Sequence, residues 1–381
     1  KVVLTVSALD EGDWGNKIKV NLTTGTSGDY SFTVKYNDNP VATYTGVSLT
    51  EGDENFIERV VNGVDKFVSV AVDQSGMAPA TGELDVDQEL KGGDDGATDI
   101  ADTDYEDALN ACKILEDANI VAIPESQSEA VCSAGLAFTE GKEDNVFICD
   151  GEEDATIEQI KAFKEGLASD YGALYYPWLL VSDPVAVGVN KTKWIPTCGH
   201  IAGTIARTDA NRSVYKAPAG LECQLYGALK VKTDVTDAEQ AVLNPIGVNV
   251  IRSFKNGGIV PWGARTMKGK YLNIRRGLNY LKVSLKNGSR WAVFEPNNSR
   301  LWRKLSVSTK AFLLSEYAKG GFKGDEPAQA FFVKCDEQTN MPETVKLGQV
   351  WIIVGVAIAE PGEFVILKIG QYDGGTVIEE M

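Results

Sequence analysis

The segment between residues 104 and 180 constrains the fold most, because strand-like and helix-like patterns alternate along it. Apolar side chains near helical spacing predict helices, and the short apolar runs between them predict buried strands. The expected helices span residues 104–116, 126–138 and 154–168, and the expected strands span residues 120–124, 145–150 and 173–180. Strands that alternate with helices favour parallel pairing. We therefore expect an α/β core.

The regions on either side of this segment have other patterns. Residues 1–90 consist mainly of strand-like runs, two of which form a predicted hairpin around the turn at 37–40. Residues 246–381 mix strands with two long helices, expected at about 275–286 and 299–319. The chain is therefore predicted to be an α/β and α+β multidomain protein, with mixed sheets flanked by helices.

We expect three domains. They are a small β-rich domain, an α/β core entered through a polar, glycine-rich connection, and an α+β domain that ends in a late strand, over residues 1–90, 91–245 and 246–381. The chain starts at Lys1 with no initiator methionine, so we expect a fragment or processed product that has lost its N-terminus.

Composition indicates a globular protein, with 43% hydrophobic and 24% charged residues. The apolar run at 350–359 is far shorter than the roughly 20 residues of a membrane helix, so we expect no membrane insertion. The six cysteines are scattered through apolar segments, which favours reduced, buried thiols over a disulfide framework. The single histidine, His200, excludes metal sites that need several histidines.

Charge is distributed very unevenly along the chain. The net charge is −17 in total, but residues 1–150 carry −21 and residues 251–310 carry +13. An acidic chain is a poor nucleic-acid binder. Its basic stretch could instead bind copies of the same chain or another acidic partner. The alternative is that the basic stretch is only a solvated face.

One segment has the residue types of a cysteine hydrolase. Cys198 and His200 lie two positions apart, with Asp209 nearby in sequence, and in an extended segment the first two side chains would point the same way. The apolar neighbours favour a buried cysteine and a hydrogen-bonded histidine instead. Farther along, Arg265 and Glu295 could form a partly buried pair that holds a domain together.

Short motifs follow one another in order through the second half of the chain. They lie at residues 175–178, 198–203, 206–209, 216–219, 243–249, 261–266, 271–276, 294–297, 301–302, 330–336 and 361–365. In this order and spacing they resemble the contractile tail sheath proteins of bacteriophages and related injection machines, over about residues 171–371. Residues 13–16 and 92–96 extend the resemblance more loosely upstream. Members of that family often have Pro-Ser where Thr197-Cys198 stand, and Ala where Gly362 stands.

The resemblance implies a structural subunit and not an enzyme. Such subunits stack as six-fold rings around a tail tube, and their contraction drives the tube through the target cell envelope. It implies no cofactor, and as partners other copies of the chain, the tube protein, and baseplate and tail terminator proteins. The expected location is the virion tail, after assembly in the host cytoplasm. A cysteine hydrolase using Cys198 and His200, or a host-surface-binding protein acting through residues 1–90, stay open as alternatives.

Two surfaces follow from combining this resemblance with the charge pattern. A basic surface would face the acidic tube or a neighbouring subunit, and comprises Arg265, Lys268, Lys270, Arg275, Arg276, Lys282, Lys286, Arg300, Arg303 and Lys304. The late strand would pair with a neighbour's sheet, and comprises Glu363, Phe364, Val365, Ile366, Leu367, Lys368 and Ile369. An N-terminal arm of the same kind would lie before Lys1, and the β-rich domain would be peripheral.

Overall fold

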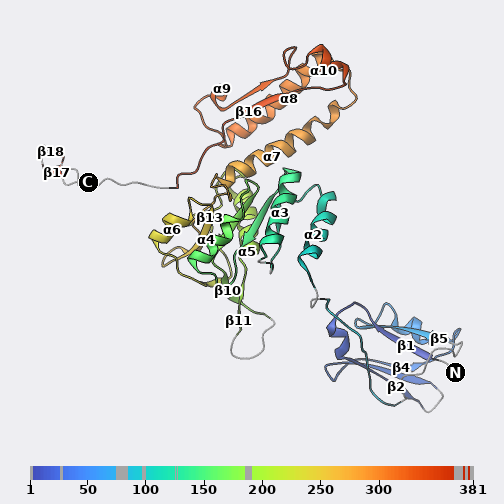
Figure 1. Cartoon of the computed structure of the whole chain (residues 1–381). Coiled ribbons are helices and arrows are strands. Elements are labelled where there is room, and N and C mark those ends of the chain that lie inside the picture. The colour runs from blue at the N-terminus through green and yellow to red at the C-terminus, as the bar shows by residue number, and fades with distance from the viewer. Residues whose placement is uncertain are drawn as a thin grey trace. The chain divides into compact units, whose positions relative to one another are not determined.

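The computed structural model describes residues 3–25, 29–73, 85–96, 100–124, 126, 128–184, 191–363, 372–373 and 376–377. The chain divides into two compact units, Lys1–Ala101 and Asp102–Met381 (Figure 1). The further domain boundary expected near residue 245 stays a prediction.

The first unit is built from two antiparallel sheets. One has the strand order β4-β3-β2-β6 and the other pairs β1 with β5. The strands are β1 (Val3–Ala8), β2 (Ile18–Thr24), β3 (Tyr30–Tyr36), β4 (Asn39–Val47), β5 (Val68–Asp73) and β6 (Gln88–Glu89), with a short helix α1 (Ile57–Val61). Asn37 and Asp38 have positive φ angles and form the predicted hairpin turn between β3 and β4. Ile18, Phe32 and Val68 are fully buried in its core.

The glycine-rich segment after β6 packs onto this unit. Gly93 and the side chain of Asn16, in the 3-10 helix η1 (Asp13–Lys17), exchange two hydrogen bonds of 2.8 and 2.9 Å. A Cβ atom on Gly93 would lie 2.3 Å from the carbonyl oxygen of Gly12. The segment expected to be a connection is therefore held against the first unit up to at least this point, and glycine is required there by a close backbone approach.

The second unit centres on a five-stranded sheet of order β14-β13-β9-β8-β7. Its strands are β7 (Ile120–Ala122), β8 (Val146–Asp150), β9 (Gly172–Tyr176), β13 (Val248–Phe254) and β14 (Gly258–Pro261). Only the β13–β14 pair is antiparallel. The predicted parallel α/β core is confirmed.

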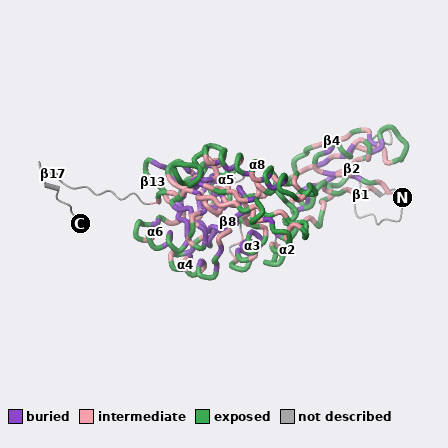
Figure 2. The backbone as a smooth tube through the Cα atoms, turned by 90° about the horizontal axis from the view of Figure 1, so that it is seen from above, coloured by how far each residue is buried: buried purple, intermediate pink, exposed green. Residues whose placement is uncertain are grey.

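Helices cover both faces of this sheet, because alternate residues of each strand point to opposite sides. On one face, Ile148 packs with α5 (Cys198–Asn211) and the start of α7 (Leu272–Ser289). On the other, Phe147 packs with α3 (Glu129–Lys142), α4 (Ile157–Glu165) and α6 (Asp237–Leu243). Figure 2 shows the buried positions gathered around β8, whereas α2 (Asp102–Ala111), followed by the 3-10 helix η2 (Cys112–Ile114), is exposed along most of its length.

One predicted strand is divided in the structure. The run at 173–180 becomes β9 and then β10 (Leu179–Ser182), separated by the cis peptide bond Tyr176–Pro177. Proline cannot donate to a strand ladder, so the chain changes sheet here. β10 pairs with β11 (Thr192–Ile195) and β12 (Ala228–Val231) in a separate antiparallel sheet.

The C-terminal part carries two long helices beside a small sheet. α7 and α8 (Ser299–Ala318) lie close to the predicted spans, and Asn298 caps α8 by accepting hydrogen bonds from the amides of Arg300 and Leu301. β15 (Phe331–Lys334) pairs antiparallel with β16 (Ile353–Val356). Two short helices, α9 (Pro327–Ala330) and α10 (Pro342–Lys346), complete it, and β17 (Tyr372–Asp373) pairs with β18 (Thr376–Val377).

Candidate assembly surfaces

The ten basic residues expected at an interface lie on three consecutive elements. The loop after β14 carries Arg265, Lys268 and Lys270, α7 carries Arg275, Arg276, Lys282 and Lys286, and α8 carries Arg300, Arg303 and Lys304. Some of these side chains form buried or partly buried contacts within the subunit, and the others are exposed on its surface.

Two of the arginines, Arg276 and Arg265, form hydrogen bonds with carboxylates of the same subunit. Arg276 is buried, and its guanidinium donates two hydrogen bonds to the carboxylate of Asp209 on α5. Arg265 donates to both carboxylate oxygens of Glu363, at 3.1 Å from Nε and 2.5 Å from Nη2, and also to the carbonyl oxygen of Gly269 at 2.8 Å. The hydrogen bond to Glu363 raises the pKa of Arg265. Neither guanidinium is free for a partner.

This geometry corrects the expected Arg265–Glu295 pair. The partner of Arg265 is Glu363, with side-chain exposures of 18% and 14%. Arg265 precedes α7 and Glu295 follows it, and a helix of 18 residues is about 27 Å long. Glu363 is the only residue of the expected late strand that belongs to the part of the chain described here, and residues 364–369 lie outside it.

Three more basic side chains have neighbours on the subunit's own surface. Lys270 pairs with Asp170 at 2.7 Å, and Lys282 pairs with Glu143, whose pKa is lowered by that hydrogen bond. The guanidinium of Arg275 lies 4.4 Å from the ring centre of Tyr171. Exposed pairs of this kind contribute little to stability and can exchange partners.

The remaining five are exposed and have no ion pair with any described residue; they are Lys268, Lys286, Arg300, Arg303 and Lys304. Three of them line a shallow groove of about 380 Å³ along α8, together with Val307, Ser308 and Ala311. The ammonium of Lys304 also lies 5.6 Å from the ring centre of Trp291. The face of α8 is therefore basic at its N-terminal half and partly apolar beyond it.

The β15–β16 sheet has only two strands among the described residues. Its register runs from the Phe331–Val356 pair to the Lys334–Ile353 pair. Outer edges of this kind present backbone groups that can pair with a strand of another chain.

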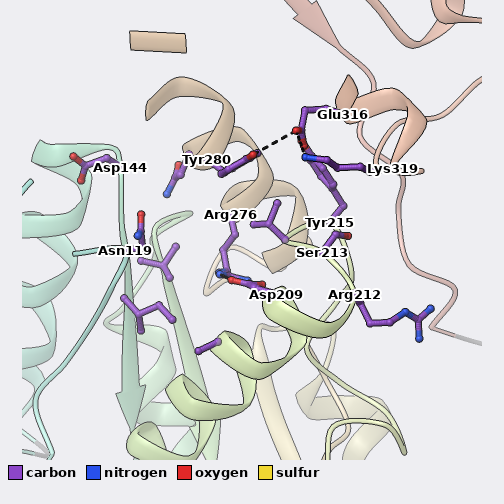
Figure 3. A pocket seen from close by; sticks show the side chains of 15 residues that line it. Asn119, Asp144, Asp209, Arg212, Ser213, Tyr215, Arg276, Tyr280, Glu316 and Lys319 are labelled. Carbon is purple, nitrogen blue, oxygen red and sulfur yellow. Dashed lines mark hydrogen bonds and ion pairs between the residues drawn. The ribbon is translucent and has the colours of Figure 1, made fainter. Parts of the chain in front are cut away.

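A pocket of about 480 Å³ lies where α5, α7 and α8 meet the starts of β7 and β8 (Figure 3). Glu316 is buried there, and its carboxylate accepts hydrogen bonds from the hydroxyl groups of Tyr215 at 3.1 Å and Tyr280 at 3.4 Å, and from Lys319 at 2.6 Å. Burial and the charge of Glu316 raise the pKa of Tyr215. These contacts, with the Arg276–Asp209 pair, tie α5 and the loop after it to α7 and α8.

The possible catalytic residues do not come together. Cys198 begins α5, so it is helical and not extended, and His200 is turned by about 200° around the helix from it. Burial, followed by the charge of Asp150, raises the pKa of the Cys198 thiol, which makes a poor nucleophile. Asp209 is bound to Arg276. These side chains do not form the site of a cysteine hydrolase.

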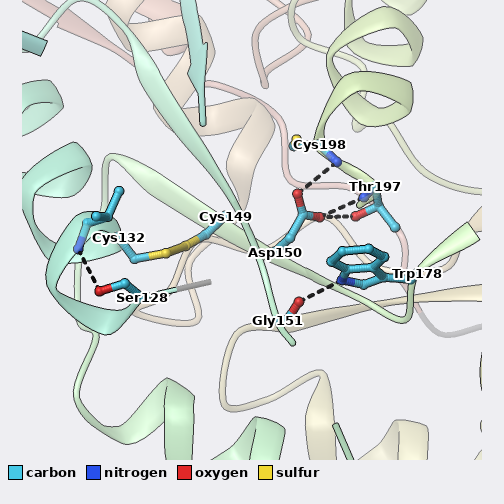
Figure 4. Close-up of a disulfide and its surroundings, with 9 residues drawn as sticks. Ser128, Cys132, Cys149, Asp150, Gly151, Trp178, Thr197 and Cys198 are labelled. Carbon is cyan, nitrogen blue, oxygen red and sulfur yellow. Dashed lines mark hydrogen bonds between the residues drawn. A yellow bond between two sulfur atoms is a disulfide. The ribbon is translucent and has the colours of Figure 1, made fainter. Parts of the chain in front are cut away.

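Asp150 has a structural role at the same place. Its buried carboxylate accepts hydrogen bonds from the amides of Thr197 at 2.9 Å and Cys198 at 3.1 Å, where α5 begins (Figure 4). This contact joins the end of β8 to α5.

The cysteines differ from expectation. Cys132 on α3 and Cys149 on β8 are joined by a disulfide, and Cys112 is exposed, so the expectation of reduced, buried thiols is wrong for these three (Figure 4). Cys198, Cys223 and Cys335 are buried free thiols, as expected. The sequence separation of 17 residues is not a recognisable motif; the pair forms because α3 packs on the sheet face to which Cys149 points.

Within the described ranges, no cluster of three or more His, Cys, Asp or Glu side chains could hold a metal ion. Nor does any helix described there have the length and hydrophobicity to cross a membrane.

Residues 99–267 match the family model described as phage tail sheath protein central domain. The chain is also similar to the tail sheath protein of Vibrio phage KVP40, with 29% identity over 162 residues. The tail sheath protein of Enterobacteria phage T4 is 26% identical over 162 residues. The matched region is 41% of this chain and spans about a quarter of each phage protein, 23% and 24% respectively.

Solved structures cover more of the chain. A sheath complex of an extracellular contractile injection system, PVC, in its contracted state has a TM-score of 0.63 and 30% identity, over 72% of this chain and 75% of that one. The helical sheath of the anti-feeding prophage in its contracted state has a TM-score of 0.60 and 28% identity, over 74% of this chain and 77% of that one.

Proposed function

Because this chain belongs to the contractile tail sheath family, we propose that it is a structural, non-enzymatic subunit that assembles with copies of itself into stacked six-fold rings around a tail tube. Contraction of this sheath drives the tube through the envelope of a target cell. The observation that carries the proposal is the match to the PVC sheath subunit, at 30% identity over about three quarters of both chains.

The proposed partners are other copies of the chain, the tube protein, and baseplate and tail terminator proteins. One similar structure, 27% identical, is that of an anti-feeding prophage baseplate, which supports contact with components at the end of a tail. The proposed location is the tail sheath of a virion or related injection machine, after assembly in the host cytoplasm.

The basic surface is proposed to face an acidic tube or the acidic side of a neighbouring subunit. Five exposed cations without an ion pair in the described part of the chain support this, and three of them lie on α8. Because exposed charges act through solvent, salt screens their attraction to a partner. Arg265 and Arg276 are not part of this proposal, since both are used inside the subunit.

The segment after Glu363 is proposed to add a strand to a neighbour's β15–β16 sheet. The contact of Glu363 with Arg265 supports this proposal, because it gives the segment a fixed starting point on the subunit. The β15–β16 sheet has two strands within the described residues, which supports the acceptor role because a further strand can be added at a sheet edge.

Negative-stain microscopy of the complete sheath protein tests the proposal, at low and high salt and with tube protein added. Tubes of stacked six-fold rings are the expected result. The double variant Arg303→Glu with Lys304→Glu should assemble less well at low salt, whereas Lys66→Glu, an exposed lysine of the first unit, is the matched control. Unassembled single subunits under every condition would overturn the proposal and favour the alternative, in which residues 1–90 bind a host surface.

A further inference from the structure

The disulfide between Cys132 and Cys149 does not fit the compartment in which the sheath is proposed to assemble. The Cα atoms of the two residues lie 6.4 Å apart, on α3 and β8, and their exposures are 2% and 1% (Figure 4). A cytoplasm keeps thiols reduced, so structural disulfides are rare in the proteins that it holds. A sheath released from the host instead meets oxidising surroundings. The pair is therefore exposed to both conditions in turn.

We propose that Cys132 and Cys149 form a redox lock. They are thiols while the sheath assembles, and a low-molecular-weight disulfide outside the host oxidises them to the bond that fixes α3 on the central sheet. The inference rests on the proposed function, because that function takes the chain from a cytoplasm to the exterior. It adds to that function a chemical maturation step that follows assembly.

The packing of α3 on the sheet does not depend on the bond. A Cβ atom on Gly135 would lie 2.5 Å from the ring of Phe147, and a Cβ atom on Gly172 would lie 2.1 Å from the side chain of Leu136. The helix is thus seated closely on β8 and β9 by other residues. Both cysteines lie in the same core cluster as Leu136 and Phe147, and buried thiols behave there as small apolar groups. The reduced subunit should therefore fold and assemble.

The bond should add stability to the second unit. It links two residues that are 17 positions apart in sequence. A cross-link that closes a loop of that size lowers the equilibrium constant for unfolding by about 100-fold. For a unit of this length, the change corresponds to a rise of about 5 °C in melting temperature. The gain comes after assembly, when the particle has left the cell that made it.

The oxidation step balances with one molecule of a small disulfide such as oxidised glutathione. The thiolate of one cysteine attacks the glutathione disulfide, forms a mixed disulfide and releases one glutathione. The thiolate of the other cysteine attacks the protein sulfur of the mixed disulfide and releases the second glutathione. Two protons pass from the cysteines to the two glutathione thiols. Because both protein sulfurs are buried, α3 must open locally first, so their reaction should be slower than that of the exposed Cys112.

Thiol counting on the variant Cys112→Ser tests the chemistry, because the exposed thiol is then removed. Protein kept in reductant should have five thiols, and oxidised glutathione should leave three, those of Cys198, Cys223 and Cys335. The melting temperature should rise by about 5 °C on oxidation. The further change Cys132→Ala should abolish this rise. Cys335→Ala, which removes another buried thiol, is the matched control and should keep the rise.

Alkylation of the complete sheath protein inside host cells, and again in particles released into medium with oxidised glutathione, reads the timing. Free thiols in the cells and a cross-linked 132–149 peptide in the particles are the expected result. A cross-link already present in the cells, five thiols that persist in oxidised glutathione, an unchanged melting temperature, or tubes that form only after oxidation would overturn the redox lock. If no tubes form in either state, the proposed function fails instead, because thiol counting reads the bond in the subunit itself.

Discussion

The contact between Arg265 and Glu363 predicts a measurable clamp at the start of the C-terminal segment. Glu363→Gln keeps the size of the side chain but removes the charge, and it leaves the guanidinium of Arg265 half-buried beside a neutral amide. The change should loosen residues 359–363 while leaving the central sheet intact. Apart from this pair, that segment is held by contacts such as the Ala359 amide to the Gly321 carbonyl, at 3.3 Å.

The size of the effect follows from burial. Breaking a fully buried ion pair costs about 3–5 kcal/mol, and exposed pairs contribute less than about 1 kcal/mol. With exposures of 18% and 14%, this pair lies between the two limits, so we expect about 2 kcal/mol. That corresponds to a rise of about 30-fold in local opening.

Hydrogen exchange of the amides of Ala359, Glu360, Gly362 and Glu363 measures this opening directly. The control is Glu360→Gln, three residues earlier, which breaks a pair with Lys323 whose side chains are each 46% exposed. It should change exchange by less than about threefold, because exposed pairs contribute little to stability. Equal exchange in the two variants, or a coupling energy below about 0.5 kcal/mol in a double-mutant cycle of Glu363 with Arg265, would show that this pair does not hold the segment in place.

Three other perturbations have clear expected outcomes. Arg276→Met leaves Asp209 without its cation and should destabilise the second unit by about 3 kcal/mol in chemical denaturation. Gly93→Ala forces a Cβ to within 2.3 Å of a carbonyl oxygen and should lower the stability of the first unit by about 1–3 kcal/mol in the same assay. Lys282 lowers the pKa of Glu143 below its ordinary value of 4.5. The stabilisation by this pair is therefore complete above pH 4.5 and is lost as the pH falls through the lowered pKa. Between about pH 5 and pH 3, the melting temperature of Glu143→Gln should fall less than that of the parent protein.

The parts of the fold that the sequence predicts are those with local signals. The alternation through 104–180 predicts the parallel sheet, and the two long helices of the C-terminal part follow from apolar spacing and end signals such as Asn298 before α8. The change of sheet after Tyr176 has a weaker signal, since the apolar run continues past Pro177. Only long-range packing decides that β10 pairs with β11 and β12.

The contacts that depend on three-dimensional proximity could not be predicted. Arg265 meets Glu363 across 98 residues, and Cys132 meets Cys149 because a helix packs on one face of a strand. The exposure of Phe294 also had no sequence signal, because an aromatic residue in an apolar run is usually buried. Phe294 lies in the motif at 294–297, but its positive φ angle is evident only in the structure.

The division of the basic residues shows why a count of charges overstates an interface. Arg265 and Arg276 use the planar guanidinium fork to hold a carboxylate through two bonds, and each joins elements far apart in the chain. On α8, Arg300, Arg303 and Lys304 are exposed beside a groove and keep their charge available to a partner. Since salt screens exposed charges far more than buried pairs, the salt dependence of assembly should reside in α8. Neutralising Arg303 should therefore reduce the salt dependence of assembly. Arg265→Gln should instead perturb the structure of the subunit itself and leave the salt dependence of assembly unchanged.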